Sequence, residues 1–318
     1  MSKTPTEPQR IALNGPTMGA RWSVLFYAPS GYDPGVLAIA LQDAVAEVDN
    51  QMSTWKPDSA LMRFNAAPVG DWVALPAHLL RVLGLGLRIG RASGGAFDIG
   101  MGDAVQAWGF GPEAANGEAI RAALTRARRP AHELLDLAPE RGEARKRAPL
   151  ALDLNGIAKG YGVDRLAEVM LEHGITSALV GIDGEMRALG LRPDGAPWSV
   201  AVEAPDPARR APHSILTLED AAVATSGDYR HWVDLGSQRL SHTMQPRRGA
   251  PVQGGPASVS VVARSCAEAD AWATVLMVLG PEEGARLARR EGLDALFLLR
   301  TPEITAIPVG RLFGGVEA

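Results

Sequence analysis

Cysteine is almost absent from this chain, because Cys266 is the only one among its 318 residues. A single thiol cannot form an internal disulfide, and it cannot supply a thiolate metal cluster. Also missing is any run of about 18 apolar residues, the length that a membrane-spanning helix needs. A basic surplus is lacking too, since 32 Lys and Arg stand against 36 Asp and Glu, for a net charge of −4. That balance argues against a general nucleic-acid binder.

Familiar nucleotide-binding and nucleophile motifs are missing as well. Residues 84–90 nearly match a dinucleotide fingerprint, but the third glycine comes one position late and the surrounding spacing is helical. The run that begins at His132 lacks the second histidine of a zinc-protease helix. A Walker A loop and a Gly-x-Ser-x-Gly elbow are both absent. A nucleotide or flavin site in this chain must therefore be of a less familiar kind.

Both ends of the chain are expected to lie outside the folded domain. Residues 1–10 are polar and contain several prolines, so we expect a disordered tail there. They lack the apolar segment of a secretory signal. This favours a cytoplasmic protein, with the periplasm as the alternative if an export leader has been removed. Residues 313–318 are expected to form a second tail.

Hydrophobic spacing predicts short strands with a few amphipathic helices between them. Helices are expected over residues 36–48, 77–92, 157–173, 266–279 and 281–290. Strands are expected over residues 21–28, 150–154, 177–182, 198–202, 258–263 and 295–300, with hairpins at 236–237 and 302–309. Residues 112–148 are rich in Arg, Ala and Glu, which indicates a solvated helical insertion without chemistry. Because most strands are joined by hairpins, the pattern predicts an α+β fold rather than a doubly wound sheet.

The strongest local motif is Asp153-Leu154-Asn155-Gly156-Ile157-Ala158-Lys159-Gly160-Tyr161, at an expected junction between a strand and a helix. Its glycines allow a ligand to approach the backbone, and free N–H groups at a helix start favour phosphate oxygens. Lys159 lies in the first turn, where its charge opposes the helix dipole. An anionic ligand would correct that mismatch. The alternative is a capped helix that carries a surface lysine.

A second motif begins the expected helix at 266–279. Ser265 and Glu268 form a capping box. Asp270 and Thr274 are four residues apart, so their oxygens lie on one helix face, which Met277 and Val278 indicate to be buried. A buried carboxylate needs a partner, and a hard cation is one candidate. An Asp–Thr hydrogen bond or an ion pair with an arginine would serve equally well.

Three further segments remain ambiguous. His242 lies in the run 241–249. A histidine side chain ordinarily titrates near neutral pH, so this residue could act as a general base or simply be structural. Arg247 and Arg248 follow it, and they could be no more than a solvated turn. Residues 222–230 and 94–98 could line a ligand or form ordinary loops.

Taken together and in this order, the segments resemble the ApbE-like FAD:protein FMN transferases. The resemblance spans about residues 11–312. The matching pieces are Thr17-Met18-Gly19, Met52-Ser53-Thr54-Trp55, Asp58-Ser59, Phe64-Asn65, Gly95-Ala96-Phe97-Asp98, Trp108-Gly109-Phe110-Gly111, residues 153–161, Ala224-Thr225-Ser226-Gly227, Tyr229-Arg230, Ser241-His242, residues 269–274 and Leu279-Gly280.

This resemblance implies a fold, an activity and a set of roles. The fold would be two intimately packed α/β subdomains with mixed, largely antiparallel sheets. The activity would be Mg²⁺-dependent transfer of FMN from FAD to a threonine hydroxyl of an acceptor flavoprotein or redox-complex subunit, with release of AMP. His242 would be the base. The implied FAD contacts are Met18, Trp55, Ala96, Phe97, Asp98, Asp153, Lys159 and Met244, and the implied Mg²⁺ ligands are Asp270, Thr274 and the backbone carbonyl of Gly156.

The chain departs from the family pattern at a few positions. Gln245 replaces a common aspartate, and Arg248 replaces a common threonine, which could reorient the loop of His242. Residues 183–185 read Asp-Gly-Glu where Gly-Gly-Asp is common, which could change flavin or acceptor preference. Ala273 stands where some members have a second acidic residue, which implies a leaner and wetter metal shell.

Two other functions remain compatible with this sequence. The same site could hydrolyse FAD to FMN and AMP, with water in place of the threonine. The chain could instead be a non-catalytic FAD-binding assembly factor for a redox enzyme, a hypothesis that Gln245 and Arg248 keep open.

Overall fold

The computed structural model describes residues 8–206, 209–229, 232–235, 238–300 and 304–313. Most of each expected tail, residues 1–7 and 314–318, lies outside them. The first expected tail is nevertheless too long. Strand β1 (Gln9–Thr17) already includes Gln9 and Arg10, whose backbone pairs with β2 (Ala20–Ala28). Phe313, expected in the second tail, packs against a hydrophobic cluster.

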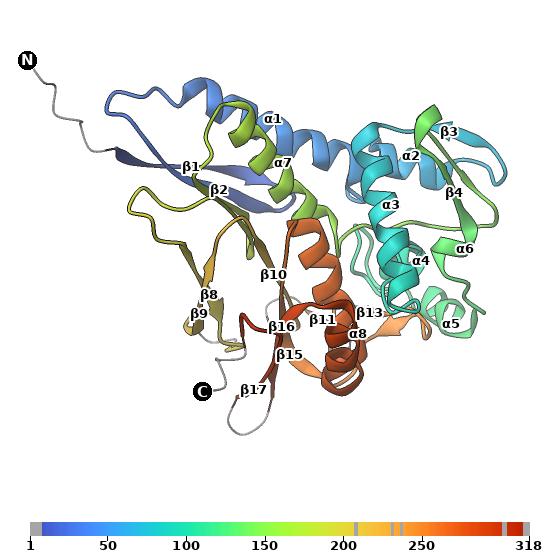
Figure 1. Ribbon diagram of the computed structural model, residues 1–318. Coiled ribbons are helices and arrows are strands. Elements are labelled where there is room, and N and C mark those ends of the chain that lie inside the picture. The colour runs from blue at the N-terminus through green and yellow to red at the C-terminus, as the bar shows by residue number, and fades with distance from the viewer. Residues whose placement is uncertain (1–7, 207–208, 230–231, 236–237, 301–303, 314–318) are drawn as a thin grey trace, which may run out of the picture.

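One antiparallel sheet organises the fold (Figure 1). In the described part of the chain it has eight strands in the order β1-β2-β6-β7-β10-β15-β16-β17. Besides β1 and β2, the strands of this sheet are β6 (Ala178–Ile182), β7 (Glu185–Leu189), β10 (Ala222–Gly227), β15 (Pro256–Ala263), β16 (Asp294–Leu299) and β17 (Thr305–Val309). Nearly every residue of β15 is buried, because Val259 and Val261 face one core cluster while Val262 faces another. Both faces of the sheet are therefore covered.

Smaller antiparallel sheets surround this one. The hairpin of β8 (Trp198–Glu203) and β9 (Pro212–Leu218) covers one face, where Trp198 packs with Val262. The others combine β3 (Trp72–Ala74), β4 (Leu135–Ala138) and β5 (Glu143–Lys146), then β11 (Trp232–Leu235) and β12 (Gln238–Ser241), and β13 (Met244–Gln245) and β14 (Ala250–Pro251). Pairing of β11 with β12 confirms the hairpin predicted at 236–237, although those two residues lie outside the described ranges. The predicted α+β class with largely antiparallel sheets is confirmed.

Helices cover the opposite face of the large sheet. Helix α8 (Cys266–Glu291) packs on β15 and β10, α7 (Ala158–Glu172) packs on α8, and α1 (Gly35–Met52) packs on α7 (Figure 1). The remaining helices are α2 (Ala60–Ala66), α3 (Ala77–Ala92), α4 (Gly102–Ala107), α5 (Gly117–Thr125), α6 (Ala131–Leu134) and the 3₁₀ turn η1 (Pro139–Arg141). No helix in the described ranges is both long and apolar enough to cross a membrane.

The two helices expected over 266–279 and 281–290 form one bent element. Gly280 has φ +75° and ψ −179°, which no helix interior adopts, and Pro281 follows it without a backbone N–H. The break therefore falls at the predicted position. Ser265 caps the start of α8, because its Oγ accepts a hydrogen bond from Glu268 N at 3.3 Å.

Two local predictions were wrong. Residues 150–154 form no strand, because Leu152 bonds to a side chain instead of a neighbouring strand: its N–H and C=O both pair with the Asn65 amide, at 2.8 and 2.9 Å. Residues 112–148 are helical only in part, since they also supply β4 and β5. Arg145 of β5 lies 4.6 Å from the ring centre of Trp72 in β3, so an arginine expected on a solvated helix stacks on a strand partner.

Candidate active site

The start of α7 lies directly against α8, and Gly160 makes this approach possible. A Cβ atom on Gly160 would lie 2.4 Å from the carbonyl oxygen of Cys266 and 2.8 Å from Cβ of Asp270. With only a hydrogen there, the N–H of Gly160 donates to Asp270 Oδ2 at 3.0 Å. The Asp270 carboxylate therefore bonds to a first-turn N–H of α7, the position at which a helix favours an anion.

Gly156 and Thr274, which carry the other two expected metal ligands, lie against each other one turn further along α8. A Cβ atom on Gly156 would lie 3.0 Å from Thr274 Oγ1 and 3.2 Å from a ring carbon of Phe97, so the loop before α7 touches the Thr274 face. Thr274 Oγ1 also lies 3.3 Å from Ser226 Oγ at the end of β10. The sequence drew attention to the segment around Ser226 but assigned no partner to this hydroxyl.

Lys159 is paired in this structure. Its Nζ lies 3.1 Å from Glu185 Oε1 and 3.9 Å from Asp183 Oδ2. Burial alone would lower the pKa of Lys159, but the charges of Glu185, Asp270 and Asp183 raise it instead. The mismatch expected between this lysine and the helix dipole is therefore already compensated by carboxylates.

Glu185 is the site residue that sequence reasoning noticed only as a departure from the family pattern. It begins β7 and is only 4% exposed. The nearby Asp183 has φ +56°, in the left-handed region that a glycine adopts more easily. A charged residue at the start of a strand was the available signal, and the sequence does not record which residue it would meet.

The pKa of the Asp270 carboxyl group is shifted by burial and by neighbouring charges. Burial, and then the negative charge of Glu185, raise the pKa of its carboxyl group to about 7, while Lys159 and the Gly160 N–H act in the opposite direction. The side chain is only 6% exposed. An added positive charge beside this carboxylate would favour its ionised form.

The residues present fit a magnesium ion. A carboxylate, a hydroxyl and a backbone carbonyl are all hard oxygen donors, which Mg²⁺ prefers. Gly156 leaves open the space beside Thr274 that a Cβ would fill. Within the described ranges no three His, Cys, Asp or Glu side chains gather as a metal site.

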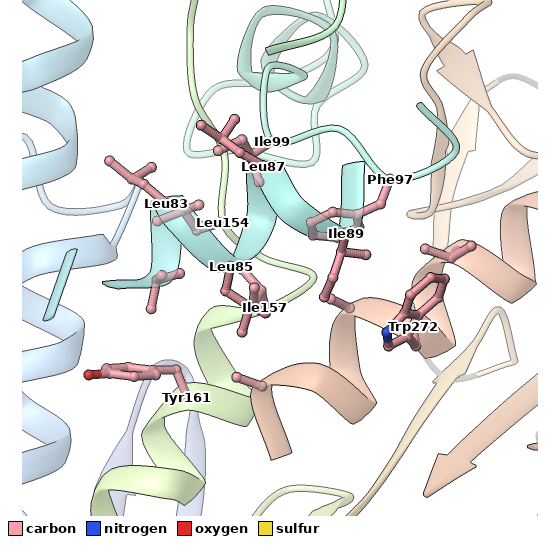
Figure 2. Close-up of a cluster of buried hydrophobic side chains, with 14 of the residues drawn as sticks. Leu83, Leu85, Leu87, Ile89, Phe97, Ile99, Leu154, Ile157, Tyr161 and Trp272 are labelled. Carbon is pink, nitrogen blue, oxygen red and sulfur yellow. The ribbon is translucent and has the colours of Figure 1, made fainter. Parts of the chain in front are cut away.

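The expected flavin contacts are spread over several elements. Met18 sits in the tight turn between β1 and β2, with φ +44°, and its Cε would lie 2.8 Å from a Cβ on Gly162 of α7. Phe97 is buried beside Gly156, and Ala96 next to it is buried as well. Trp55 follows α1 and is 61% exposed. Figure 2 shows Phe97 and Trp272 at one end of the main hydrophobic cluster and Tyr161 at the other.

Two of the expected contacts are aspartates whose carboxylates already bond locally. Asp98 Oδ1 accepts hydrogen bonds from Gly100 N at 2.8 Å and Ala131 N at 3.0 Å, and burial still raises the pKa of this group. Asp153 accepts from Asn155 N at 2.9 Å, and burial raises its pKa to about 6. Both side chains hold the shape of loops that border Gly156 or Phe97.

His242 and Met244 belong to a separate loop. The His242 side chain is exposed, just after β12, while Met244 is buried against α4 and α5 in a cluster that includes Val105 and Ile120. The structure therefore brings Gly156, Lys159, Asp270 and Thr274 together at the α7–α8 contact, and it places Met244 in a different core cluster.

Comparisons with known proteins agree on one family. The ApbE family model matches residues 18–297. The FAD:protein FMN transferase of Vibrio cholerae serotype O1 is 36% identical over 297 residues, which cover 93% of this chain and 89% of that relative. The enzyme of that name from Escherichia coli K12 is 34% identical over 294 residues, covering 91% and 84%.

Solved structures give the same result. The flavinyl transferase ApbE of Pseudomonas stutzeri, in its apo form, superposes with a TM-score of 0.85 at 35% identity, covering 98% of this chain and 99% of that one. The flavin transferase ApbE from Vibrio cholerae superposes with a TM-score of 0.82 at 34% identity, covering 95% and 97%. The similarity therefore extends over almost the whole chain.

Proposed function

This chain belongs to the ApbE family and is an FAD:protein FMN transferase, and we propose that it passes FMN to a threonine hydroxyl of an acceptor flavoprotein and releases AMP. The observation that carries this proposal is the α7–α8 contact. There a buried carboxylate, a hydroxyl and a lysine lie around the first turn of a helix. Such a place suits a pyrophosphate with its metal ion.

Substrate binding falls to the residues at the start of α7. Lys159 and the N–H groups of the first turn would hold oxygens of the FAD pyrophosphate. Met18, Trp55, Ala96, Phe97, Asp98, Asp153 and Met244 are the proposed contacts for the rest of FAD. Mg²⁺ held by Asp270, Thr274 and the Gly156 carbonyl would neutralise charge on the phosphate oxygens during transfer.

The chemical step is a phosphoryl transfer. His242 takes the proton from the threonine hydroxyl, and the threonine oxygen attacks the phosphorus on the FMN side of the pyrophosphate. The bond between that phosphorus and the bridging oxygen breaks, and AMP leaves with the bridging oxygen. The products are a threonine–FMN phosphoester and AMP. The exposed position of His242 is compatible with a hydroxyl that arrives on another protein.

The test is AMP release from FAD, with and without Mg²⁺ and with a threonine-containing flavoprotein acceptor. We expect Mg²⁺-dependent AMP, with FMN covalently fixed to the acceptor as seen by mass spectrometry. An acceptor in which the target threonine is changed to alanine is the matched control. AMP with free FMN would instead identify an FAD pyrophosphatase. Bound FAD without any AMP would identify a non-catalytic assembly factor.

A further inference from the structure

The loop that follows His242 is folded back on itself. Val252 N donates to Thr243 O at 2.8 Å, which closes the loop at its base. Above this bond, β13 and β14 pair through Gln245 and Ala250. Gly249 N donates to Gln245 O at 3.1 Å. Residues 242–252, here called the His242 loop, therefore form one compact unit whose placement depends on what it rests against.

That support is the α4–α5 region. The indole Nε1 of Trp108, which directly follows α4, donates to Gly249 O at 2.9 Å, across 141 positions of sequence. At the other end of the loop, Met244 is buried with Ile120 and Ala123 of α5. Ile120 and Ala123 belong to residues 112–148, the segment expected to be an insertion without chemistry, and they pack against the loop next to the proposed base.

The contact at Gly249 is close enough to fix the loop backbone. Gly249 has φ +60°, and a Cβ there would lie 2.5 Å from the Ala123 carbonyl oxygen and 2.7 Å from Arg128 Nε. Arg128 is itself held by Asp103, with NH1–Oδ1 and NH2–Oδ2 distances of 3.0 and 3.2 Å. The surface under Gly249 is therefore closely packed, and only glycine fits against it.

We propose that Trp108 is a positioning residue for the transfer reaction, because its hydrogen bond to Gly249 holds the His242 loop on α4–α5 and so fixes the base. This inference rests on the proposed function, in which His242 accepts the threonine proton. The backbone of the loop carries the imidazole, so a displacement of the loop displaces the base with it. Small errors in that position are costly for proton transfer.

The first measurement is independent of activity. Arg247 and Arg248 are exposed at the loop tip, so trypsin cleavage after them, identified by mass spectrometry, reports how often the loop leaves its support. Trp108→Phe keeps most of the ring and removes the N–H donor. We expect cleavage there to become about 3- to 10-fold faster, the range for one neutral hydrogen bond. Trp198→Phe is the matched control. In the wild-type protein Trp198 Nε1 also donates to a backbone carbonyl, that of Leu189, at 3.2 Å, but neither residue belongs to the His242 loop.

The second measurement is steady-state transfer. We expect Trp108→Phe to lower kcat about 3- to 10-fold, whereas Trp198→Phe leaves kcat and the KM for FAD unchanged. In a His242→Ala background Trp108→Phe should have no further effect on kcat, because the two residues act as one unit. Gly249→Ala disturbs the same contact from the loop side. Gly249→Ala should also give faster trypsin cleavage and a lower kcat, so the inference can still be tested if Trp108→Phe folds poorly.

The outcomes separate this inference from the proposed function. If the wild-type protein fixes FMN to the acceptor and Trp108→Phe matches Trp198→Phe in cleavage rate and kcat, the inference is overturned and the function stands. A further loss of kcat in the His242→Ala background would also overturn it, since Trp108 would then act by another route. A wild-type protein that transfers no FMN would overturn the proposed function itself, and the positioning role with it.

Discussion

Lys159 Nζ lies 3.1 Å from Glu185 Oε1, and the two residues join the first turn of α7 to the first residue of β7. The Glu185 carboxylate thus already pairs with Lys159, the lysine that the proposed mechanism assigns to the FAD pyrophosphate. Glu185 and the phosphate would therefore compete for one cation. Asp183, at 3.9 Å from the same Nζ, adds a weaker contribution.

From this relationship we expect Glu185→Gln to bind FAD more tightly, because the lysine charge becomes available to the phosphate. One charge-assisted hydrogen bond corresponds to a change of about 10-fold in dissociation constant. Quenching of flavin fluorescence during titration, without Mg²⁺, measures it. Glu185→Asp keeps the charge and serves as the control. Weaker binding by Glu185→Gln would mean that the carboxylate aims the lysine rather than competing for it.

Asp270→Ala is expected to abolish Mg²⁺-dependent transfer, because it removes the only charged side chain among the three proposed ligands. A thermal-shift titration gives a second readout. Mg²⁺ should raise the Tm of the wild-type protein and leave that of Asp270→Ala unchanged. Asp43→Ala, on the exposed face of α1, should behave like wild type. Activity retained by Asp270→Ala would refute the metal assignment.

His242→Ala should keep FAD binding and lose transfer. Loss of a general base lowers the rate by about 10²- to 10⁴-fold. The Tm of the variant is measured as well, which separates loss of the base from a folding defect. FAD titration and acceptor labelling are measured on the same preparation. If binding is lost instead, His242 is a cofactor or structural residue.

Asp164 should be a stability residue rather than a catalytic one. Its Oδ1 and Oδ2 accept hydrogen bonds from Cys266 N at 2.8 Å and Ala267 N at 2.9 Å, at the start of α8, and it pairs with Arg187. Asp164→Ala leaves these groups unpaired in the interior, at a cost of about 3–5 kcal/mol in the free energy of unfolding. Urea denaturation measures this. Asp194→Ala removes a similar but exposed arrangement and should barely move the midpoint.

His78 should make a contribution to stability that is lost below neutral pH, opposite in sign to that of Asp270 and Asp153, whose raised pKa values favour the folded state as the pH falls. The Nδ1 atom of His78 lies 2.6 Å from Tyr161 Oη, and burial, then repulsion from Arg165, lowers the pKa of His78 below its ordinary 6.5, with Glu47 acting in the opposite direction. The unfolded chain therefore takes up this proton first. The contribution of neutral His78 to stability is complete above about pH 6.5 and is lost as the pH falls from there through the lower pKa of the folded state. The difference in Tm between His78→Gln and wild type should shift in favour of the variant as the pH is lowered from about pH 7.5 to about pH 5.5. If Tm depends on pH equally in wild type and His78→Gln, His78 does not contribute to the pH dependence of stability.

Several elements could be predicted because their signals are local. The helix predicted over 77–92 coincides with α3, and the break at Gly280 follows from a glycine and a proline in succession. Asp270 and Thr274 are four residues apart, a spacing that puts both side chains on one face of any helix. The family was identified correctly in the same way, from an ordered series of short motifs.

Other features depended on partners that are remote in sequence. The segment 150–154 looks like a strand, yet the N–H and C=O of Leu152 bond to the side chain of Asn65, 87 positions before it. The segment 112–148 has a helical composition, yet β5 forms because β3 and β4 pair with its two edges. Tertiary pairing outweighs local propensity when a second strand supplies the backbone hydrogen bonds.

The sequence by itself determined the fold class and the family, because periodicity, capping and motif order are properties of neighbouring residues. Only the tertiary structure decided that Glu185 pairs with Lys159, that Gly160 lets α7 touch Asp270, and that Trp108 supports the His242 loop. These contacts join positions 26, 110 and 141 residues apart. They exist because packing brings distant segments within hydrogen-bond distance, and no local pattern records which segments will meet.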